Sequence, residues 1–203
     1  MKALIIPILI LSFIVEWTPQ EKQQAKSNID DSKMSPDEKD VLYYINLVRI
    51  NPNKFESEVL NPFLKKNKKY SRKYIKSLRK DLKNTNKLTP LNYTDELFKF
   101  AKHHAKTTGK KGKTGHQSVS RKGYKARTKK LLKNYSVVGE NIHYGQKQPK
   151  TIVLELLIDD GIKGVGHRKN ILSSQYKYAS VSIQPHKKHI FNTVIEFGGA
   201  LNQ

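Results

Sequence analysis

The sequence contains no cysteine among its 203 residues. Disulfide bonds, thiolate metal ligands and a cysteine nucleophile are therefore excluded. Two familiar catalytic patterns are also missing, because there is neither a serine-nucleophile motif nor a His-Glu-x-x-His helix. A chain of this length nevertheless buries enough apolar surface to fold as one domain without covalent cross-links.

Acidic residues are scarce. The sequence has 17 Asp and Glu against 39 Lys and Arg, a formal net charge of +22. Such an excess favours acidic partners in general, and nucleic acid, anionic lipid, acidic glycan and acidic protein all fit it. Much of the positive charge lies in two blocks. Lys65 to Lys83 contains only one acid, Asp81, and Lys102 to Lys133 contains none.

The first twenty residues are typical of a targeting segment. Lys2 precedes an apolar run, Ala3 to Val15, that is too short to cross a bilayer comfortably. We expect 1–20 to be a signal peptide of a secreted protein. An uncleaved N-terminal anchor is the alternative, because no small-x-small triplet marks a cleavage site. Residues 21–34 contain few apolar side chains and predict a disordered linker, so that the folded domain spans 35–203.

Helical patterns dominate the first part of this domain. Ser35 to Glu38 is a capping box that begins a helix ending at Asn51. A short helix is predicted over 54–64. Lys65 to Lys83 then predicts an amphipathic basic helix, and Thr94 caps a further helix.

The basic helix has two interpretations. Its charged face is either solvated while the helix packs on the domain, or it is a docking surface for a polyanion. So large an excess of one sign is not needed for solvation alone. The candidate polyanion-binding residues are Lys65, Lys66, Lys68, Lys69, Arg72 and Lys73.

Strand patterns dominate the second part. Tyr135 to Gly145 predicts a short strand that turns at Gly139, and Pro149 to Asp160 predicts an apolar helix leading to a glycine-lined turn with His167. Tyr178 to Pro185 and Ile190 to Gly198 alternate as the two strands of a hairpin with a basic tip. Helices followed by antiparallel strands indicate an α+β domain.

Asp159 and Asp160 fall in the predicted last turn of the apolar helix. The partial negative charge at a helix C-terminus disfavours carboxylates there. We therefore expect a compensating cation, which can be a basic side chain, the nearby His167 as an imidazolium, or a bound metal ion.

Five short motifs occur along the chain in a fixed order. They are Ile45-Asn46-x-x-Arg49-x-x-Pro52, Leu91-x5-Leu97-x3-Ala101, Gly115-His116, Gly139-Glu140-Asn141-Ile142 and Gly166-His167-Arg168-x-Asn170-Ile171-Leu172. With these motifs the chain resembles the CAP superfamily, also called the SCP-like extracellular domain. This superfamily includes cysteine-rich secretory proteins, antigen 5 and plant pathogenesis-related group 1 proteins. The cysteine-free sequence is more similar to the bacterial and protist branches.

The resemblance implies an α-β-α sandwich with a cleft that holds two histidines and two acids. By motif these are His116, Glu140, Asp160 and His167, with Asp159 as the alternative second acid. The family's second acid is usually Glu after a Trp, and both features are missing here. His143 is a further residue that can point toward the cleft. His103 and His104 are interpreted as ordinary helix residues, because a histidine on an apolar helix face is more often part of the core than a ligand.

The predicted tetrad has two chemical interpretations. Imidazoles and carboxylates suit zinc or another divalent cation, with His116 and His167 as metal ligands. Alternatively, a metal-free network of His–carboxylate hydrogen bonds holds the loops in place. The spacing of these residues does not separate the two.

Three functional classes remain. The first is a secreted, non-enzymatic binding module, for which the resemblance implies a sterol or fatty acid in a groove and the charge implies an anionic membrane or glycan. The second is a metal-dependent, peptidase-like hydrolase with Glu140 as general base. The third, nucleic-acid binding, is disfavoured by the leader and by the lack of interleaved exposed aromatics. The oligomeric state does not follow from the sequence.

Overall fold

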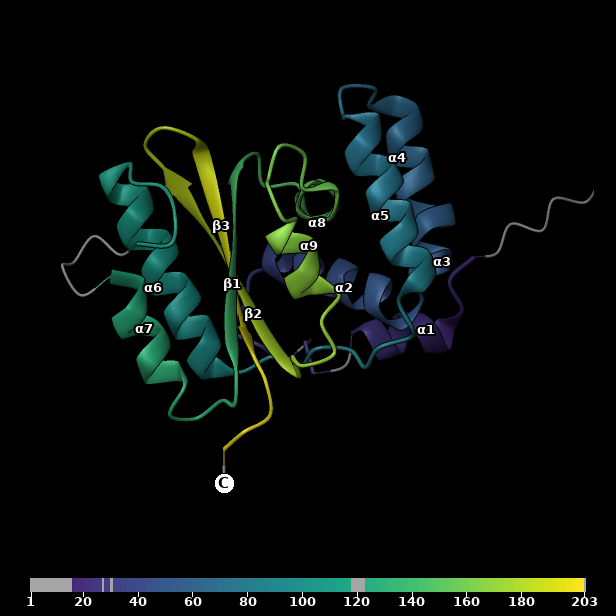
Figure 1. Ribbon diagram of the computed structural model, residues 1–203. Helices are drawn as coiled ribbons and strands as arrows, with labels where there is room; N and C mark the ends of the chain where they lie inside the picture. Colours follow the sequence, from purple (N-terminus) through teal and green to yellow (C-terminus); the bar gives the residue numbers. More distant parts are fainter. Residues whose placement is uncertain (1–15, 27, 30, 118–122, 203) are drawn as a thin grey trace, which may run out of the picture.

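The computed structural model describes residues 16–26, 28–29, 31–117 and 123–202. They form three layers, with a small sheet in the middle and helices on both of its faces (Figure 1). Helices α6 (Asp95–Lys111) and α7 (Gly123–Leu131) cover one face. Helices α2 (Pro36–Ile50), α8 (Pro149–Ile158) and α9 (Gly166–Ile171) cover the other. This arrangement confirms the predicted α+β class and the α-β-α sandwich.

The sheet has three antiparallel strands in the order β1-β3-β2. Strand β1 spans Val138–Gly145, β2 spans Tyr178–His186 and β3 spans Ile190–Gly198. The predicted hairpin is thus confirmed. The turn expected at Gly139 was wrong, because β1 runs straight through this residue. A Cβ there would lie 2.3 Å from the hydroxyl oxygen of Tyr176, so glycine allows that ring to pack closely.

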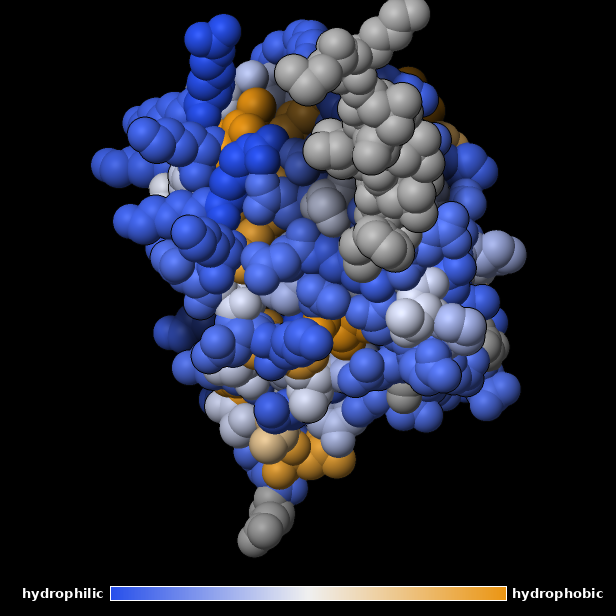
Figure 2. Space-filling model, turned by 90° about the vertical axis from the view of Figure 1, so that its right-hand side faces the viewer, coloured by the Kyte–Doolittle hydropathy of each residue, from blue (hydrophilic) through white to orange (hydrophobic). Residues whose placement is uncertain are grey.

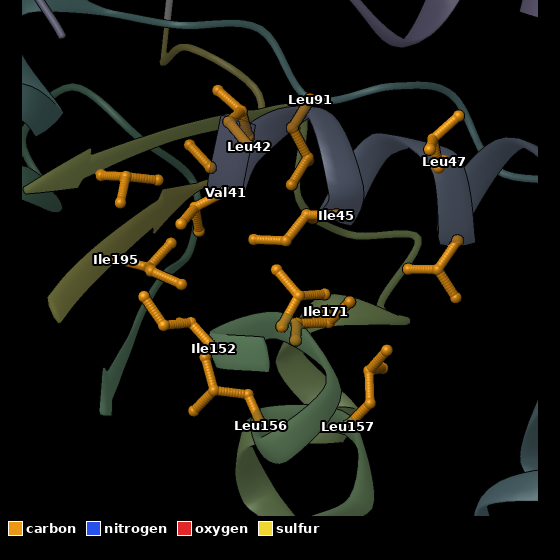
Figure 3. Close-up of a cluster of buried hydrophobic side chains, with 14 of the residues drawn as sticks. Val41, Leu42, Ile45, Leu47, Leu91, Ile152, Leu156, Leu157, Ile171 and Ile195 are labelled. Carbon is orange, nitrogen blue, oxygen red and sulfur yellow. The ribbon is translucent and has the colours of Figure 1, made fainter. Parts of the chain in front are cut away.

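Helix α2 forms the centre of the larger core. The Ser35 side chain accepts the backbone N–H of Glu38, and the Glu38 carboxylate accepts that of Ser35, as the capping box predicts. The buried side of α2 packs between the sheet and α8 (Figure 3). The labelled side chains in this contact include Val41, Leu42, Ile45, Ile152, Leu156 and Ile195.

Two polar motif residues connect α2 to distant segments. Asn46 donates to the carbonyls of Ala25 and Leu91 and accepts the N–H of Leu91. The fully buried guanidinium of Arg49 donates to the carbonyls of four residues. These are Thr89, Ile171, Ser173 and Tyr176, at 2.8 to 3.2 Å. The motif that marks this helix in the sequence therefore has a structural role.

The segment before α2 differs from the disordered linker expected over 21–34. Helix α1 (Pro19–Ala25) begins at a capping box formed by Thr18 and Glu21. Ala25, Ile29 and Met34 are buried in the main core. The expected boundary between signal peptide and linker therefore falls inside α1. Most of the predicted signal peptide, 1–15, lies outside the described residues.

The first basic block also differs from the single helix expected over Lys65 to Lys83. The chain forms α3 (Pro52–Phe55), a π-helical turn η1 (Glu56–Leu60) and α4 (Asn61–Lys66), then reverses into α5 (Arg72–Asn84). Asn67 caps the C-terminus of α4, where its side-chain amide donates to the carbonyl of Phe63. We call residues 65–73, at this reversal, the α4–α5 tip.

No helix in the described part of the chain is both long and apolar enough to cross a membrane.

Candidate functional site

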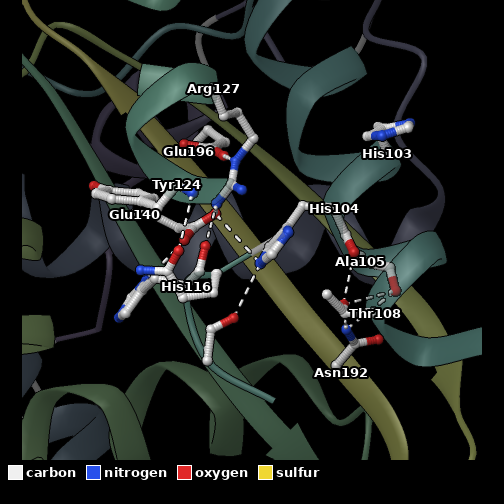
Figure 4. A network of polar contacts seen from close by, with 12 residues as sticks. His103, His104, Ala105, Thr108, His116, Tyr124, Arg127, Glu140, Asn192 and Glu196 are labelled. Atoms are coloured by element: carbon white, nitrogen blue, oxygen red, sulfur yellow. Dashed lines mark hydrogen bonds and ion pairs between the residues drawn. The ribbon is translucent and has the colours of Figure 1, made fainter. Parts of the chain in front are cut away.

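A cluster of ionisable side chains lies on the α6/α7 side of the sheet (Figure 4). Its centre is a pair of buried acids, Glu140 on β1 and Glu196 on β3, which are direct partners in the strand register. Two carboxylates at paired positions repel each other when both are ionised. A cation or a shared proton is therefore needed between them.

Arg127 of α7 supplies the cation. One guanidinium nitrogen donates to Glu140 Oε2 at 2.5 Å, and Nε donates to Glu196 Oε1 at 3.3 Å. The same guanidinium also donates to the carbonyl of His116 at 3.2 Å. Arg127 is itself buried. It therefore fastens α7 to the sheet and to the loop that carries His116.

His116 is the second partner of the Glu140 carboxylate. Its Nδ1 lies 2.7 Å from Glu140 Oε1, so that each oxygen of this carboxylate has a strong partner. About half of the His116 side chain, 47%, is exposed, and its ring packs on Tyr124. Two members of the predicted tetrad, His116 and Glu140, are thus in direct contact.

The two acids have pKa values displaced in opposite directions. Burial raises the pKa of Glu140, but the hydrogen bond from His116 and the charge of Arg127 outweigh burial and lower it. Burial and the neighbouring Glu140 charge raise the pKa of Glu196 well above its ordinary value, against the attraction of Arg127. When the pair holds a single proton, these opposite displacements favour the proton on Glu196 and the charge on Glu140.

Three members of this cluster were missed by sequence reasoning. His104 of α6 faces it, with Nε2 3.9 Å from Glu140 Oε2 and 3.2 Å from the Gly115 carbonyl. Burial lowers the pKa of His104. Glu196 had one usable signal, since it is the only acid in an otherwise apolar and polar-neutral strand. Arg127 had none, because nothing separates it from its basic neighbours. His103 is exposed and does not take part in the cluster.

The second histidine forms its own pair on the other side of the sheet. His167 Nδ1 lies 2.7 Å from Asp159 Oδ1, and Asp159 Oδ2 accepts the backbone N–H of His167 at 3.0 Å. The acid beside His167 is therefore Asp159, the alternative second acid, and the first choice, Asp160, was wrong. Its carboxylate instead accepts the backbone N–H of Ser71 at the α4–α5 tip.

The reason is that α8 ends at Ile158, two residues before the predicted end at Asp160. Asp159 adopts a left-handed conformation (φ 56°) directly after Ile158, which turns its side chain back toward the start of α9. The N-terminal N–H groups of α9 and the His167 ring then compensate the buried carboxylate, so that the expected compensation comes from the protein itself.

Replacing these two acids separately tests the assignment. We expect Asp159→Asn to lower stability by about 1–3 kcal/mol, because a charged, buried acceptor of three hydrogen bonds is lost while Asn still tolerates the left-handed backbone. Asp160→Asn, at an exposed position, should change stability by less than about 0.5 kcal/mol. Thermal unfolding of both variants measures the difference, and equal losses would contradict the pairing.

The four predicted tetrad residues do not form one contact group. Glu140 points toward α6 and α7, whereas its neighbour Asn141 points toward α9 and donates to the carbonyl of His167. Within the described ranges, no hydrogen bond or ion pair joins the His116–Glu140 pair to the His167–Asp159 pair. Asn170 links the two sides only through the Glu140 carbonyl and the Asn141 side chain.

A divalent cation does not fit this arrangement. Both oxygens of Glu140 are already engaged, and the guanidinium of Arg127 places a fixed positive charge beside them. Among the residues that the structure describes, no three His, Asp or Glu side chains are grouped suitably for a metal ion. His116 and His167 therefore belong to two separate pairs on opposite sides of the sheet.

His143 belongs to a third group. Its Nε2 lies 2.8 Å from Glu155 of α8, which also accepts the Tyr70 hydroxyl at 2.7 Å and pairs with Lys69 at 3.2 Å. The hydrogen bond with His143 contributes most to lowering the pKa of Glu155 to about 2. These contacts hold the α4–α5 tip against α8 and the sheet.

Residues 42–197 match the sequence model of the CAP family, described as the cysteine-rich secretory protein family. The chain belongs to this family. No curated protein sequence matches it.

The solved structures that are similar to the chain include the following two. One is an extracellular protein containing an SCP domain from Bacillus anthracis str. Ames, with 17% identity and a TM-score of 0.47 over 83% of this chain. The similarity covers 45% of the Bacillus protein, less than half of its length. The other is an outer surface protein from Borrelia burgdorferi, with 19% identity and a TM-score of 0.45, over 64% of this chain and 94% of that one.

Proposed function

We propose that this protein is an extracellular, non-enzymatic binding module that attaches to an anionic surface through the α4–α5 tip. The observation that carries the proposal is the exposure of the predicted polyanion-binding residues on this one reversal. They are Lys65, Lys66, Lys68, Lys69, Arg72 and Lys73. CAP domains are typically extracellular, which supports this location for the present family member.

The charges at the tip are largely free to meet a partner. Among the described residues, Lys69 is the only one of the six with an ion pair, to Glu155. The surrounding face is predominantly hydrophilic (Figure 2). Like charges held close together on a short turn repel one another, and an anionic partner relieves this repulsion. Two acids contact the tip: Glu155 binds Lys69 and Tyr70, and Asp160 accepts the backbone N–H of Ser71.

The alternative, a metal-dependent hydrolase, has less support. A general base needs a carboxylate oxygen that can accept a proton from water or substrate. Both oxygens of Glu140 are bound by Arg127 and His116, and its lowered pKa makes it a weaker base. The cluster is better suited to holding α7 and the His116 loop on the sheet.

Charge removal at the tip tests the proposal. We expect the variant Lys65→Gln, Lys66→Gln, Lys68→Gln, Lys73→Gln to bind heparin and anionic vesicles at least about 100-fold more weakly, since each lysine near an anionic surface contributes about 1 kcal/mol. Binding is measured by heparin chromatography and vesicle co-sedimentation over a range of salt concentrations. Weakening with increasing salt is expected for the parent.

A control variant removes four charges at the other end of the molecule. Lys129, Lys130, Lys133 and Lys177 are exposed near the end of α7 and the start of β2, which lie opposite the tip (Figure 1). Their replacement by Gln changes the net charge equally and should cost much less affinity. Equal losses in the two variants would mean that net charge alone drives binding, and the proposal would be wrong.

A further inference from the structure

The turn between β2 and β3 exposes a large apolar side chain. Ile190 is 72% exposed, more than any other large apolar residue that the structure describes. Its backbone is in the left-handed region, with φ of 64°, which is unfavourable for a β-branched side chain. An exposed isoleucine on strained backbone does not stabilise the fold. Backbone strain of this kind is concentrated at functional sites.

Lysines surround Ile190. Six exposed lysines come from the end of α6, the residues after it and the turn itself: Lys106, Lys110, Lys111, Lys113, Lys187 and Lys188. No ion pair in the described part of the chain involves any of them. A hollow of about 430 Å³ lies between α6 and the turn, lined by Lys106, Lys110, Lys187 and Ile190 among others. We call this turn and its lysines the β2–β3 tip.

The β2–β3 tip is held firmly on α6. The N–H of Lys187 donates to the carbonyl of Gly109 at 3.1 Å, and Nε2 of the buried His186 lies 3.0 Å from the carbonyl of Lys113. Gly109 permits this contact, because a Cβ there would lie 2.2 Å from the carbonyl oxygen of Pro185. Ile190 is thus presented on a rigid support, which lowers the entropy lost when it binds.

The two tips lie at the same end of the molecule. In Figure 1 the α4–α5 reversal, the C-terminal end of α6 and the β2–β3 turn all reach the upper end of the protein. They come from opposite sides of the sheet. A single extended surface can therefore contact both tips at once, whereas a short ligand reaches one.

We propose that this end of the protein binds an anionic phospholipid bilayer, with Ile190 inserted among the acyl chains and the lysines of both tips on the lipid phosphates. This inference rests on the proposed function and specifies that the anionic surface is a phospholipid bilayer. A basic tip alone fits a glycan equally well, but an acidic glycan offers nothing apolar to Ile190. In a bilayer, basic side chains meet the headgroups while apolar ones enter the interface.

The variant Ile190→Asn separates this role from a structural one. Asn tolerates the left-handed backbone, so that the melting temperature should stay the same or rise. Affinity for vesicles of phosphatidylcholine and phosphatidylserine should nevertheless fall about tenfold, the effect of losing one buried apolar side chain. Binding to heparin should not change. Leu201→Asn, at a 56% exposed leucine near the C-terminus and away from both tips, is the matched control and should bind like the parent.

Insertion can be observed directly because the chain has no cysteine. Ile190→Cys labelled with an environment-sensitive fluorophore should show a blue shift and an intensity gain with anionic vesicles. The same label at Leu201→Cys should show neither. Equal vesicle affinity of Ile190→Asn and the parent, or no spectral change at position 190, would overturn the insertion. If the parent binds heparin but not vesicles, the bilayer proposal is wrong while the proposed function stands. Binding to neither would overturn both.

Discussion

Replacing Arg49 with Met is expected to lower the stability of this protein by about 3–5 kcal/mol, a loss at the upper end of what single substitutions cause. The guanidinium is fully buried and donates to the carbonyls of Thr89, Ile171, Ser173 and Tyr176. Methionine fills much of the same space but donates nothing. Four backbone acceptors would then have no donor in a region that water reaches poorly.

The loss is measured as a melting temperature, which should fall by about 10 °C. Arg49→Lys should recover part of the loss only, since an ammonium on a flexible stem does not match the planar fork that reaches four carbonyls. The control is Arg72→Met at the exposed start of α5, where little change is expected. If Arg49→Met melts like the control, the hydrogen bonds of Arg49 are not a main support of the fold.

The two buried acids of the sheet are expected to respond to neutral substitution with opposite signs. Glu140→Gln removes the carboxylate that accepts from Arg127 and His116, and at neutral pH should cost about 3 kcal/mol. Glu196→Gln mimics the protonated acid, keeps an oxygen for Arg127 Nε, and should raise the melting temperature by about 2–4 °C.

The pH dependence follows from the displaced pKa values. The raised pKa of Glu196 contributes stability at low pH that is lost as pH rises from about 4.5 through the higher folded pKa. The gain in Glu196→Gln should therefore grow from pH 5 to pH 8. The lowered pKa of Glu140 contributes stability above about pH 4.5 that is lost as pH falls. The penalty of Glu140→Gln should shrink accordingly in acid.

Melting curves of the parent and both variants between pH 4 and pH 8 test these signs. A stabilised Glu140→Gln, or a Glu196→Gln that becomes less favourable with rising pH, would reverse the assignment of charge and proton within the pair.

Local signals in the sequence predicted much of the fold. The capping box at Ser35 to Glu38 places the start of α2, and alternation places β2 and β3. Such features depend on residues a few positions apart, so they can be recognised in one sequence. The α1 segment was missed for the opposite reason. It has few apolar residues, and its burial depends on packing against α2, for example through Asn46.

The candidate site was likewise predictable only where local signals or motifs marked its residues. Family motifs placed His116 and Glu140 in one cleft, and helix electrostatics named His167 as one of three candidates for compensating Asp159 and Asp160. Which of the two Asp residues is used depended on one left-handed residue at the end of α8. The parts played by Arg127 and His104 depended on side chains that meet across layers, and residue spacing carries no information about such contacts.

The hydrogen bonds of Arg49 also determine when the fold can be completed. Their acceptors at Ile171, Ser173 and Tyr176 are more than 120 residues further along the chain. A ribosome that has made α2 must therefore translate most of the remaining protein before this helix finds its partners. Until then Arg49 stays hydrated, so that α2 cannot take its buried place in the domain while the chain is still being made.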